Sequence, residues 1–530
     1  MTSSHTAAIP VQGADGNTRP TSATPASGGE ARHASSGKGG AGSGPPARLD
    51  TRDLVVVVLL IISAFVAILN ETTMGIAIPH LNADLGLPPE LGQWLTSAFM
   101  LSMAVIIPIT GILLQRFTTR QVYLAAMIAF TVGTLICAIA PGFVVLLAGR
   151  VVQALGTGIM LPLLMTTLMN VVPEKNRGLM MGFVGMVISL APAVGPTVSG
   201  IILDNLHWRW VFGLVLPLAI IALVVGAIFM RNLGETRKAP IDVLSIFLSA
   251  LGFGGAVFGL SQFGSHGGAA EGGDSIGVSP VVLGVTSLVI GVAMLGLFVW
   301  RQLALQKRER ALLDLRTFRS RNFSIAVVIM AIVALSMFGT LTLLPQYLQN
   351  VVQLDSTTSG LVLMPGALLM GVLGPVIGAI YDRVGARVLL VPGTIIIAGS
   401  LFCYSMAGAH TPVWMLFAIQ TVMSLGLALA FTPLFSSSLG SLEPRLYSHG
   451  SASLNTLQQV GGAAGVAVLL AAYSGILHAG EAEGLATPEA GEPAAQAAFF
   501  TAFCIALVPV VLAWFVRKPE GTAPIAHGGH

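Results

Sequence analysis

The sequence is dominated by long apolar segments, each close to the length that crosses a lipid bilayer. About 20 apolar residues span the hydrocarbon core as a helix. A spanning segment must satisfy its own backbone hydrogen bonds, so each one is expected to be an α-helix. We therefore predict an all-α polytopic membrane protein with fourteen transmembrane helices. The predicted spans are about 54–79, 91–115, 120–140, 143–167, 178–203, 211–230, 241–262, 279–300, 323–346, 358–380, 388–408, 412–436, 450–474 and 496–516.

The composition and the charge pattern support this class. The chain is 54% hydrophobic and 9% charged, whereas a soluble domain carries roughly 25% charged residues. If the N-terminus is cytoplasmic, 24 of the 26 basic residues fall in cytoplasmic segments, as the positive-inside rule requires. We therefore expect a multi-pass protein of the inner or plasma membrane with both termini in the cytoplasm.

Several other classes are not expected from the sequence. The basic residues are scattered over the predicted cytoplasmic turns, which does not favour nucleic-acid binding. The sequence has no Gly-rich nucleotide loop with Lys and no clustered set of metal ligands. We therefore expect no enzyme activity, no ATP-driven transport, no cofactor and no metal, and we favour a monomer.

A repeated pattern divides the chain into two halves. GILLQRFTTR, from Gly111, follows the second span, and GAIYDRVGAR, from Gly378, follows the tenth. Parallel six-span repeats are typical of transporters. The stretch from Arg301 to Arg321 is basic and is expected to form a helical surface element. The predicted domains are a disordered cytoplasmic tail (1–53), an N-terminal six-helix bundle (54–230), two inserted helices with a cytoplasmic linker (231–322), a C-terminal six-helix bundle (323–516) and a cytoplasmic tail (517–530).

Glu71 is the one carboxylate that lies deep inside an apolar segment far from either end. A carboxylate in hydrocarbon is costly, so it is usually functional and faces a cavity or a partner. Burial also changes the balance between its charged and neutral forms, which is the chemistry that a proton-coupled transporter needs. Arg150, in the oppositely directed fourth span, is expected at a similar depth as the counter-charge. The alternatives are a neutral, hydrogen-bonded Glu71 and a static structural ion pair.

Several motifs resemble the major facilitator superfamily, in particular its fourteen-span drug:proton antiporters of the EmrB/QacA type. They include GAIYDRVGAR, LLAGRVVQALGTG, APAVGPTVSG, IDVLSIFLSALG and SASLNTLQQVGGAAG, in the family's order. The first span reads LNETTMGIAIP, with Asn70 where the family usually has Asp and the acid moved to Glu71. This variant is similar to a subgroup that includes lincomycin-resistance exporters. The resemblance implies a major facilitator fold, two six-helix bundles plus two extra helices.

The resemblance also implies roles for two sets of residues. The Gly/Asp/Arg turns are expected to form a conformational latch, weaker in the first copy because Gln115 replaces the Asp; alternatively, their arginines only enforce topology. The expected latch residues are Gly111, Arg116, Arg120, Gly378, Asp382, Arg383, Gly385 and Arg387. Ala191, Gly195 and Ser199 recur every four residues and predict a ridge that packs tightly against another helix. The full antiporter motif is Ala191, Gly195, Pro196, Ser199 and Gly200.

Polar or aromatic residues within apolar spans are the candidate substrate contacts. Each could instead be an inter-helix hydrogen bond or an interfacial residue. The residues expected to line the cavity are Asn70, Thr73, Gln93, Trp94, Gln153, Gln346, Tyr347, Asn455 and Gln458.

Together these features predict proton-coupled efflux of amphipathic drugs or antibiotics by alternating access, with Glu71 and Arg150 coupling the proton. The expected partners are a small amphipathic substrate, protons and the lipid bilayer. One alternative is an exporter of an endogenous amphipathic metabolite or lipid with the same mechanism. Another is a receptor or scaffold that has a transporter fold and moves no substrate.

Overall fold

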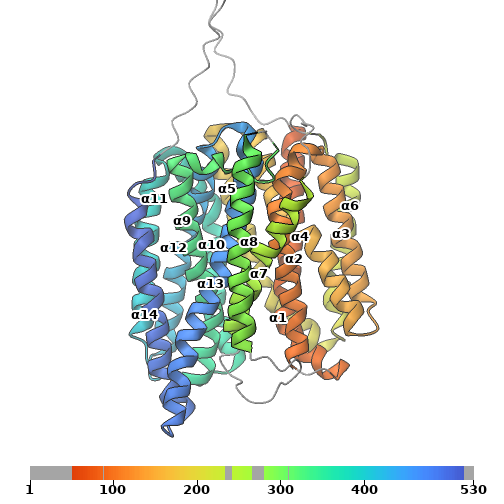
Figure 1. Ribbon diagram of the computed structural model, residues 1–530. Coiled ribbons are helices and arrows are strands. Elements are labelled where there is room, and N and C mark those ends of the chain that lie inside the picture. Colours follow the sequence, from red (N-terminus) through yellow and green to blue (C-terminus); the bar gives the residue numbers. More distant parts are fainter. Residues whose placement is uncertain (1–50, 87–88, 233–241, 266–279, 308–309, 518–530) are drawn as a thin grey trace, which may run out of the picture. The chain divides into compact units, whose positions relative to one another are not determined.

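The computed structural model describes residues 51–86, 89–232, 242–265, 280–307 and 310–517, which form long helices joined by short turns (Figure 1). Fourteen of the helices are long and apolar enough to cross a membrane, which confirms the predicted number. Of the predicted tails, residues 1–50 and 518–530 lie outside the described part of the chain. The first helix already begins at Thr51, inside the segment predicted as a tail.

The helices follow one another in three groups. The first group is α1 (Thr51–Leu85), α2 (Pro89–Arg116), α3 (Thr119–Ala138), α4 (Phe143–Val171), α5 (Arg177–Asn205) and α6 (Arg209–Phe229). The inserted pair is α7 (Val243–Ser265) and α8 (Pro280–Gln306). The last group is α9 (Arg321–Gln346), α10 (Ser356–Val384), α11 (Ala386–Ser405), α12 (Val413–Gly440), α13 (Tyr447–Ala482) and α14 (Thr487–Ala513). Four short helical turns are η1 (Glu174–Asn176), η2 (Leu315–Arg319), η3 (Tyr347–Val351) and η4 (Pro444–Leu446).

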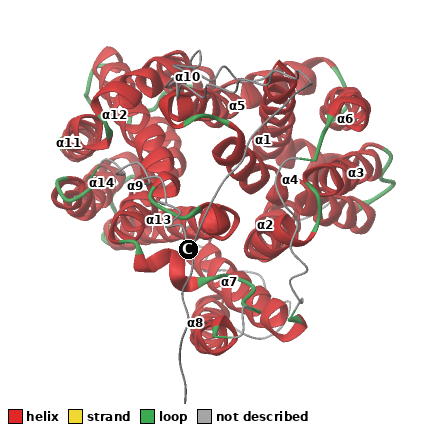
Figure 2. Ribbon diagram, turned by 90° about the horizontal axis from the view of Figure 1, so that it is seen from above, coloured by secondary structure: helices red, strands yellow, loops and turns green. Residues whose placement is uncertain are grey.

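The packing within the first six helices recurs in the last six. Helix α3 packs against α4 and α6, just as α11 packs against α12 and α14. Helix α1 packs against α5, and α2 against α4, just as α9 packs against α13 and α10 against α12. Figure 2 shows the two groups side by side, with α7 and α8 next to α2 and α13.

Among the described residues, the main helix contacts between the two groups are those of α5 with α10, α2 with α13, α4 with α13, and α5 with α12. Helix α7 packs against both α2 and α13, and α8 covers α7. We refer to the end of the helices that carries the turns α2–α3, α4–α5, α10–α11 and α12–α13 as the basic end.

The stretch Arg301–Arg321, predicted to be a helical surface element, is helical only in part of its described residues. Helix α8 ends at Gln306, and in the described part of the linker only η2 is helical. The Gln302 side-chain oxygen accepts from the backbone N–H of Leu312 at 2.7 Å, so the linker folds back onto α8. Asp314 then accepts from the N–H of Arg316 at 2.9 Å and starts η2. These local side-chain bonds compete with a continuous helix.

Two turns at the basic end show how the sequence repeat is realised. Gly385 separates α10 from α11 with φ +85°, in the left-handed region that glycine adopts without strain. The corresponding residue of the first copy is Thr118, whose φ is −67°. Thr118 instead caps α3, exchanging hydrogen bonds with Gln121 in a capping box. The two copies therefore make similar turns by different local chemistry.

Candidate functional site

Glu71 lies on α1 among polar residues that face the protein interior. Glu71 itself is partly buried, whereas Asn70 and Thr73 are almost fully buried. The Thr73 hydroxyl donates to the backbone carbonyl of Asn70 at 3.0 Å. Both side-chain amide atoms of Asn70 are buried without a hydrogen-bond partner among the described residues. A buried amide without a hydrogen-bond partner is costly. Helix α1 therefore carries such an amide, that of Asn70, next to the Glu71 carboxylate.

Arg150 lies on α4 with only 1% of its surface exposed. Its Nη1 donates to Gln153 Oε1 at 2.7 Å, its Nε donates to the Leu95 carbonyl at 3.5 Å, and its guanidinium lies 4.0 Å from the centre of the Phe99 ring. Gln153 in turn donates to Thr134 Oγ1 at 2.7 Å. These neutral groups hold the buried cation in place.

Glu71 and Arg150 interact through their charges. In the described part of the chain, the hydrogen bonds of Arg150 go to Gln153 and Leu95 rather than to the carboxylate. The two groups are therefore electrostatically coupled without a direct ion pair.

The small-residue ridge on α5 packs directly beside Glu71. The Ser199 hydroxyl donates to the Thr73 carbonyl at 2.9 Å, and Thr72 Oγ1 donates to the Ala191 carbonyl at 3.3 Å. A Cβ on Gly195 would lie 2.2 Å from Thr72 Oγ1. The partner of the ridge is thus α1, at the two residues that follow Glu71. Gly200 faces open space, and the side chain of Pro196 lies outside the described part.

The second copy of the expected latch lies where α10 crosses the start of α5. Asp382 Oδ1 accepts from the N–H of Gly178 at 2.7 Å, and Oδ2 accepts from the N–H of Leu179 at 2.9 Å. A carboxylate is stabilised at a helix N-terminus by the free N–H groups and the helix dipole. Arg383 and Arg387 are exposed, and the Arg387 guanidinium lies 5.0 Å from the Trp514 ring centre.

The backbones of α5 and α10 touch at this crossing. A Cβ on Gly378 would lie 2.0 Å from the Gly178 carbonyl oxygen, and a Cβ on Gly374 would lie 2.5 Å from that of Gly182. Two pairs of glycines spaced by four residues therefore allow the backbones of the two halves to approach closely. We had not predicted Gly178, Gly182 and Gly374, although the spacing of small residues is a known sequence signal of tight helix crossing.

The first copy of the latch makes a looser contact with α13. The Gln115 side-chain N–H donates to the Arg445 carbonyl and to Ser448 Oγ, both at 3.3 Å. A Cβ on Gly111 would lie 3.2 Å from His449 Nδ1, so there is more room here than at Gly378. Arg120 donates to the Ala227 carbonyl at 2.7 Å and ties α3 to the end of α6. Arg116 is exposed, with its guanidinium 5.9 Å from the Phe117 ring centre.

The remaining candidate cavity residues occupy different places. Trp94 is 40% exposed, with its ring 5.6 Å from the Phe258 ring of α7, so it lies at the insert. Tyr347 is fully buried and donates to the Gly408 carbonyl at 2.9 Å. Asn455 is buried and donates to the Ser451 carbonyl of its own helix at 2.8 Å. Gln458 is also buried, Gln346 is partly buried, and the Gln93 side chain lies outside the described part.

A charged cluster lies at the other end of α1. Asp84 Oδ2 accepts from Trp208 Nε1 at 2.8 Å, and it lies 3.3 Å from His207 Nε2 and 3.9 Å from Arg209 Nη1. The hydrogen bond from Trp208 is the main cause that holds the pKa of the Asp84 carboxyl below its usual value. The cluster ties the C-terminal end of α1 to the turn before α6.

Comparison with known proteins gives consistent matches over most of the chain. The sequence model described as Major Facilitator Superfamily matches residues 60–466. The uncharacterized MFS-type transporter YcnB of Bacillus subtilis is 40% identical over 470 residues, covering 88% of this chain and 96% of YcnB. The lincomycin resistance protein LmrB of Listeria monocytogenes is 37% identical over 478 residues, covering 88% of this chain and 98% of LmrB.

More distant matches agree with these. A multidrug resistance protein B homolog of Mycobacterium tuberculosis is 29% identical over 426 residues, covering 80% of this chain and 77% of that protein. The crystal structure of the human organic anion transporter MFSD10 (TETRAN) superposes with a TM-score of 0.58 at 17% identity, covering 87% of this chain and 99% of that one. At this identity the likeness concerns the fold.

Proposed function

Since the chain belongs to the major facilitator superfamily of membrane transporters, we propose that it exports amphipathic drugs or antibiotics in exchange for protons. Two of the relatives are named for resistance to lincomycin and to multiple drugs. In this proposal the protein lies in the plasma membrane with both termini, and therefore its basic end, in the cytoplasm. The two halves, 54–230 and 323–516, alternate between states open to either side.

The observation that carries the proposal is the contact of the α5 ridge with Thr72 and Thr73, the two residues that follow Glu71 on α1. Protonation of Glu71 would remove its attraction to Arg150. Ser199 donates a hydrogen bond to the Thr73 carbonyl, and Gly195 lies close to Thr72. A shift of α1 would therefore move α5 as well. Helix α5 is also the partner of α10 at the glycine crossing. The proton site is thus linked to the closure at the basic end through a single helix.

The cytoplasmic closure in this mechanism consists of the Asp382 cap and the glycine crossing. Opening the basic end would separate Gly178 from Gly378 and expose the N–H groups that Asp382 now accepts from. The looser contact of Gln115 with Arg445 would break at the same time. A substrate bound between the halves would then exchange with the cytoplasm.

The test is a drug-susceptibility panel, with lincomycin included, in an efflux-deficient host. Glu71→Gln keeps the shape of the side chain but cannot carry the proton, so we expect it to abolish resistance and pH-gradient-driven efflux while the protein remains folded. Glu483→Gln, which alters an exposed acid after α13, is the matched control and should behave as wild type. Normal efflux by the Glu71→Gln variant would disprove the proposed proton site.

A further inference from the structure

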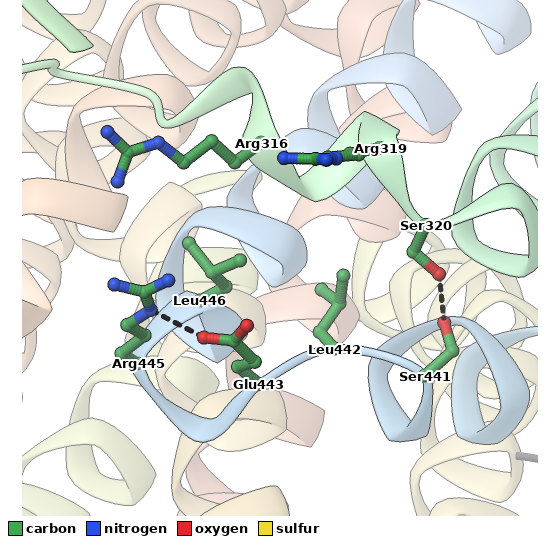
Figure 3. A pocket seen from close by; sticks show the side chains of 8 residues that line it. All are labelled: Arg316, Arg319, Ser320, Ser441, Leu442, Glu443, Arg445 and Leu446. Carbon is green, nitrogen blue, oxygen red and sulfur yellow. Dashed lines mark hydrogen bonds and ion pairs between the residues drawn. The ribbon is translucent and has the colours of Figure 1, made fainter. Parts of the chain in front are cut away.

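A pocket of about 230 Å³ lies at the basic end, between η2 and the turn that joins α12 to α13 (Figure 3). None of its lining residues is among the predicted latch, antiporter-motif or proton-site residues, although the backbone carbonyl of Arg445 accepts from Gln115 beside the first latch copy. The lining residues are Arg316, Arg319, Ser320, Ser441, Leu442, Glu443, Arg445 and Leu446.

The pocket carries more positive than negative charge. Its lining has three arginines and one glutamate. Arg445 Nε donates to Glu443 Oε2 at 2.6 Å, and Arg316 Nη2 donates to the Gln306 carbonyl at 2.9 Å, with Asp314 3.9 Å from Arg316 Nε. Arg319 is exposed and forms no ion pair or hydrogen bond with any residue in the described ranges. Unused guanidinium N–H groups therefore remain around the space.

The walls of the pocket are fixed to each other. Ser320 Oγ donates to Ser441 Oγ at 3.2 Å, which joins η2 to the end of α12 (Figure 3). Asn322 donates to the Ser437 carbonyl at 3.2 Å one turn away. The two segments that carry the arginines are thus joined before any ligand arrives, which lowers the entropic cost of binding.

The position and size of the pocket indicate its ligand. The candidate membrane spans that contain α9 and α13 begin at Arg321 and Pro444, beside the pocket. In a membrane the pocket would therefore lie near the surface of the bilayer. One water molecule needs about 10–15 Å³ of such space, so the volume of about 230 Å³ admits a multi-atom anion. Forked guanidinium groups match the oxygens of a phosphoryl group.

We propose that this pocket binds an anionic phosphoryl group. The group could be supplied by the head group of an anionic phospholipid or by free phosphate, which share this chemistry. In the absence of the anion, Glu443 neutralises Arg445. The anion therefore competes with the Glu443 carboxylate for Arg445 and is shared with Arg316 and Arg319 from the linker.

The test follows thermal unfolding of the purified full-length protein in two arms. One arm titrates inorganic phosphate in detergent against chloride at equal ionic strength. The other compares phosphatidylcholine nanodiscs with and without phosphatidylglycerol. We expect stabilisation in at least one arm. Stabilisation by phosphate identifies free phosphate as a sufficient ligand, and stabilisation by phosphatidylglycerol alone identifies the lipid.

Three variants make the test specific to the pocket. Combining Arg319→Gln with Arg445→Gln should weaken the apparent affinity roughly tenfold or more, since charge-assisted contacts are lost. Glu443→Gln should strengthen it, because the competing carboxylate is gone, and a folding defect cannot produce that result. Arg231→Gln, an exposed arginine outside the pocket, should leave it unchanged. A flat response of the wild-type protein in both arms, or equal weakening by Arg231→Gln, would overturn the proposal.

Discussion

The glycine crossing of α5 and α10 allows a quantitative prediction. A Cβ added at Gly378 would lie 2.0 Å from the Gly178 carbonyl oxygen, 2.6 Å from its carbon and 2.9 Å from Leu179 Cα. All three are backbone atoms, so no side-chain rotation can relieve the clash. Ordinary contact begins at 3.4 Å, so the helices must separate by 1.4 Å (3.4 minus 2.0).

This separation would also break the bonds that Asp382 accepts from Gly178 and Leu179. Overpacking of this kind costs about 1–3 kcal/mol, which corresponds to a change of about 5- to 150-fold in a conformational equilibrium. Gly378→Ala should therefore shift the protein away from the state that is closed at the basic end. The matched control is Gly360→Ala on the same helix, where nothing lies within 4 Å of the added Cβ. Both changes raise helix propensity equally.

The assay is a spin-label distance measurement between Lys175 and Val388, two exposed residues that flank the crossing. The labels are placed in a protein in which Cys137, Cys403 and Cys504 have been replaced. We expect Gly378→Ala to populate longer distances than wild type, and Gly360→Ala to match wild type. Identical distance distributions for Gly378→Ala and wild type would refute the reasoning.

Three further predictions concern other contacts. Gly195→Val should push α5 away from α1, because the added Cβ would lie 2.2 Å from Thr72 Oγ1. The variant should have a lower melting temperature and a larger proton leak in proteoliposomes. The control Gly200→Val, where nothing lies within 4 Å of the added Cβ, should change neither quantity. Arg150→Lys should abolish transport, because an ammonium cannot make the forked contacts to Gln153 and Leu95. The control Arg231→Lys, at an exposed arginine, should retain transport, and a fully active Arg150→Lys would contradict the assigned role. The hydrogen bonds from Arg301 hold the pKa of Asp242 at about 2, against an ordinary 3.8. This lowered value makes the ion pair stabilising above about pH 4, with loss of that contribution as the pH falls through about 2. Asp242→Asn should therefore cost about 1 kcal/mol at neutral pH, a small value because the pair is partly solvated, and its melting temperature should converge on wild type as the pH approaches 2.

The sequence predicts the number of membrane-spanning helices but not where each helix ends. Hydropathy identifies the part of a helix that lies in hydrocarbon. Helix α13 continues to Ala482, well beyond the predicted end at 474, and α14 begins at Thr487, before the predicted start at 496. Those extensions hold Glu481 and Glu489, polar residues that a helix can carry once it has left the apolar region.

The sequence indicates which kinds of residue belong to the candidate site, but it does not show which of them contact each other. The spacing of Ala191, Gly195 and Ser199 predicts a packing ridge, but only the folded chain places Thr72 and Thr73 of α1 against it. Local sequence likewise cannot give the partner of Asp382, because the N–H groups that it accepts from lie 203 and 204 residues away. Trp94 was predicted to line the cavity because it is an aromatic residue in an apolar span, and local sequence does not show that its ring lies 5.6 Å from the Phe258 ring of α7.

The two sides along which the halves contact each other differ, because the inserted helices cover one of them. On one side, α5 and α10 meet directly through glycine. On the other, α7 bridges α2 and α13, and α8 lies outside it. Any movement that parts α2 from α13 must carry α7 along one of them and slide it over the other. The α7 side is therefore covered by the insert, whereas on the α5–α10 side the two halves contact each other directly.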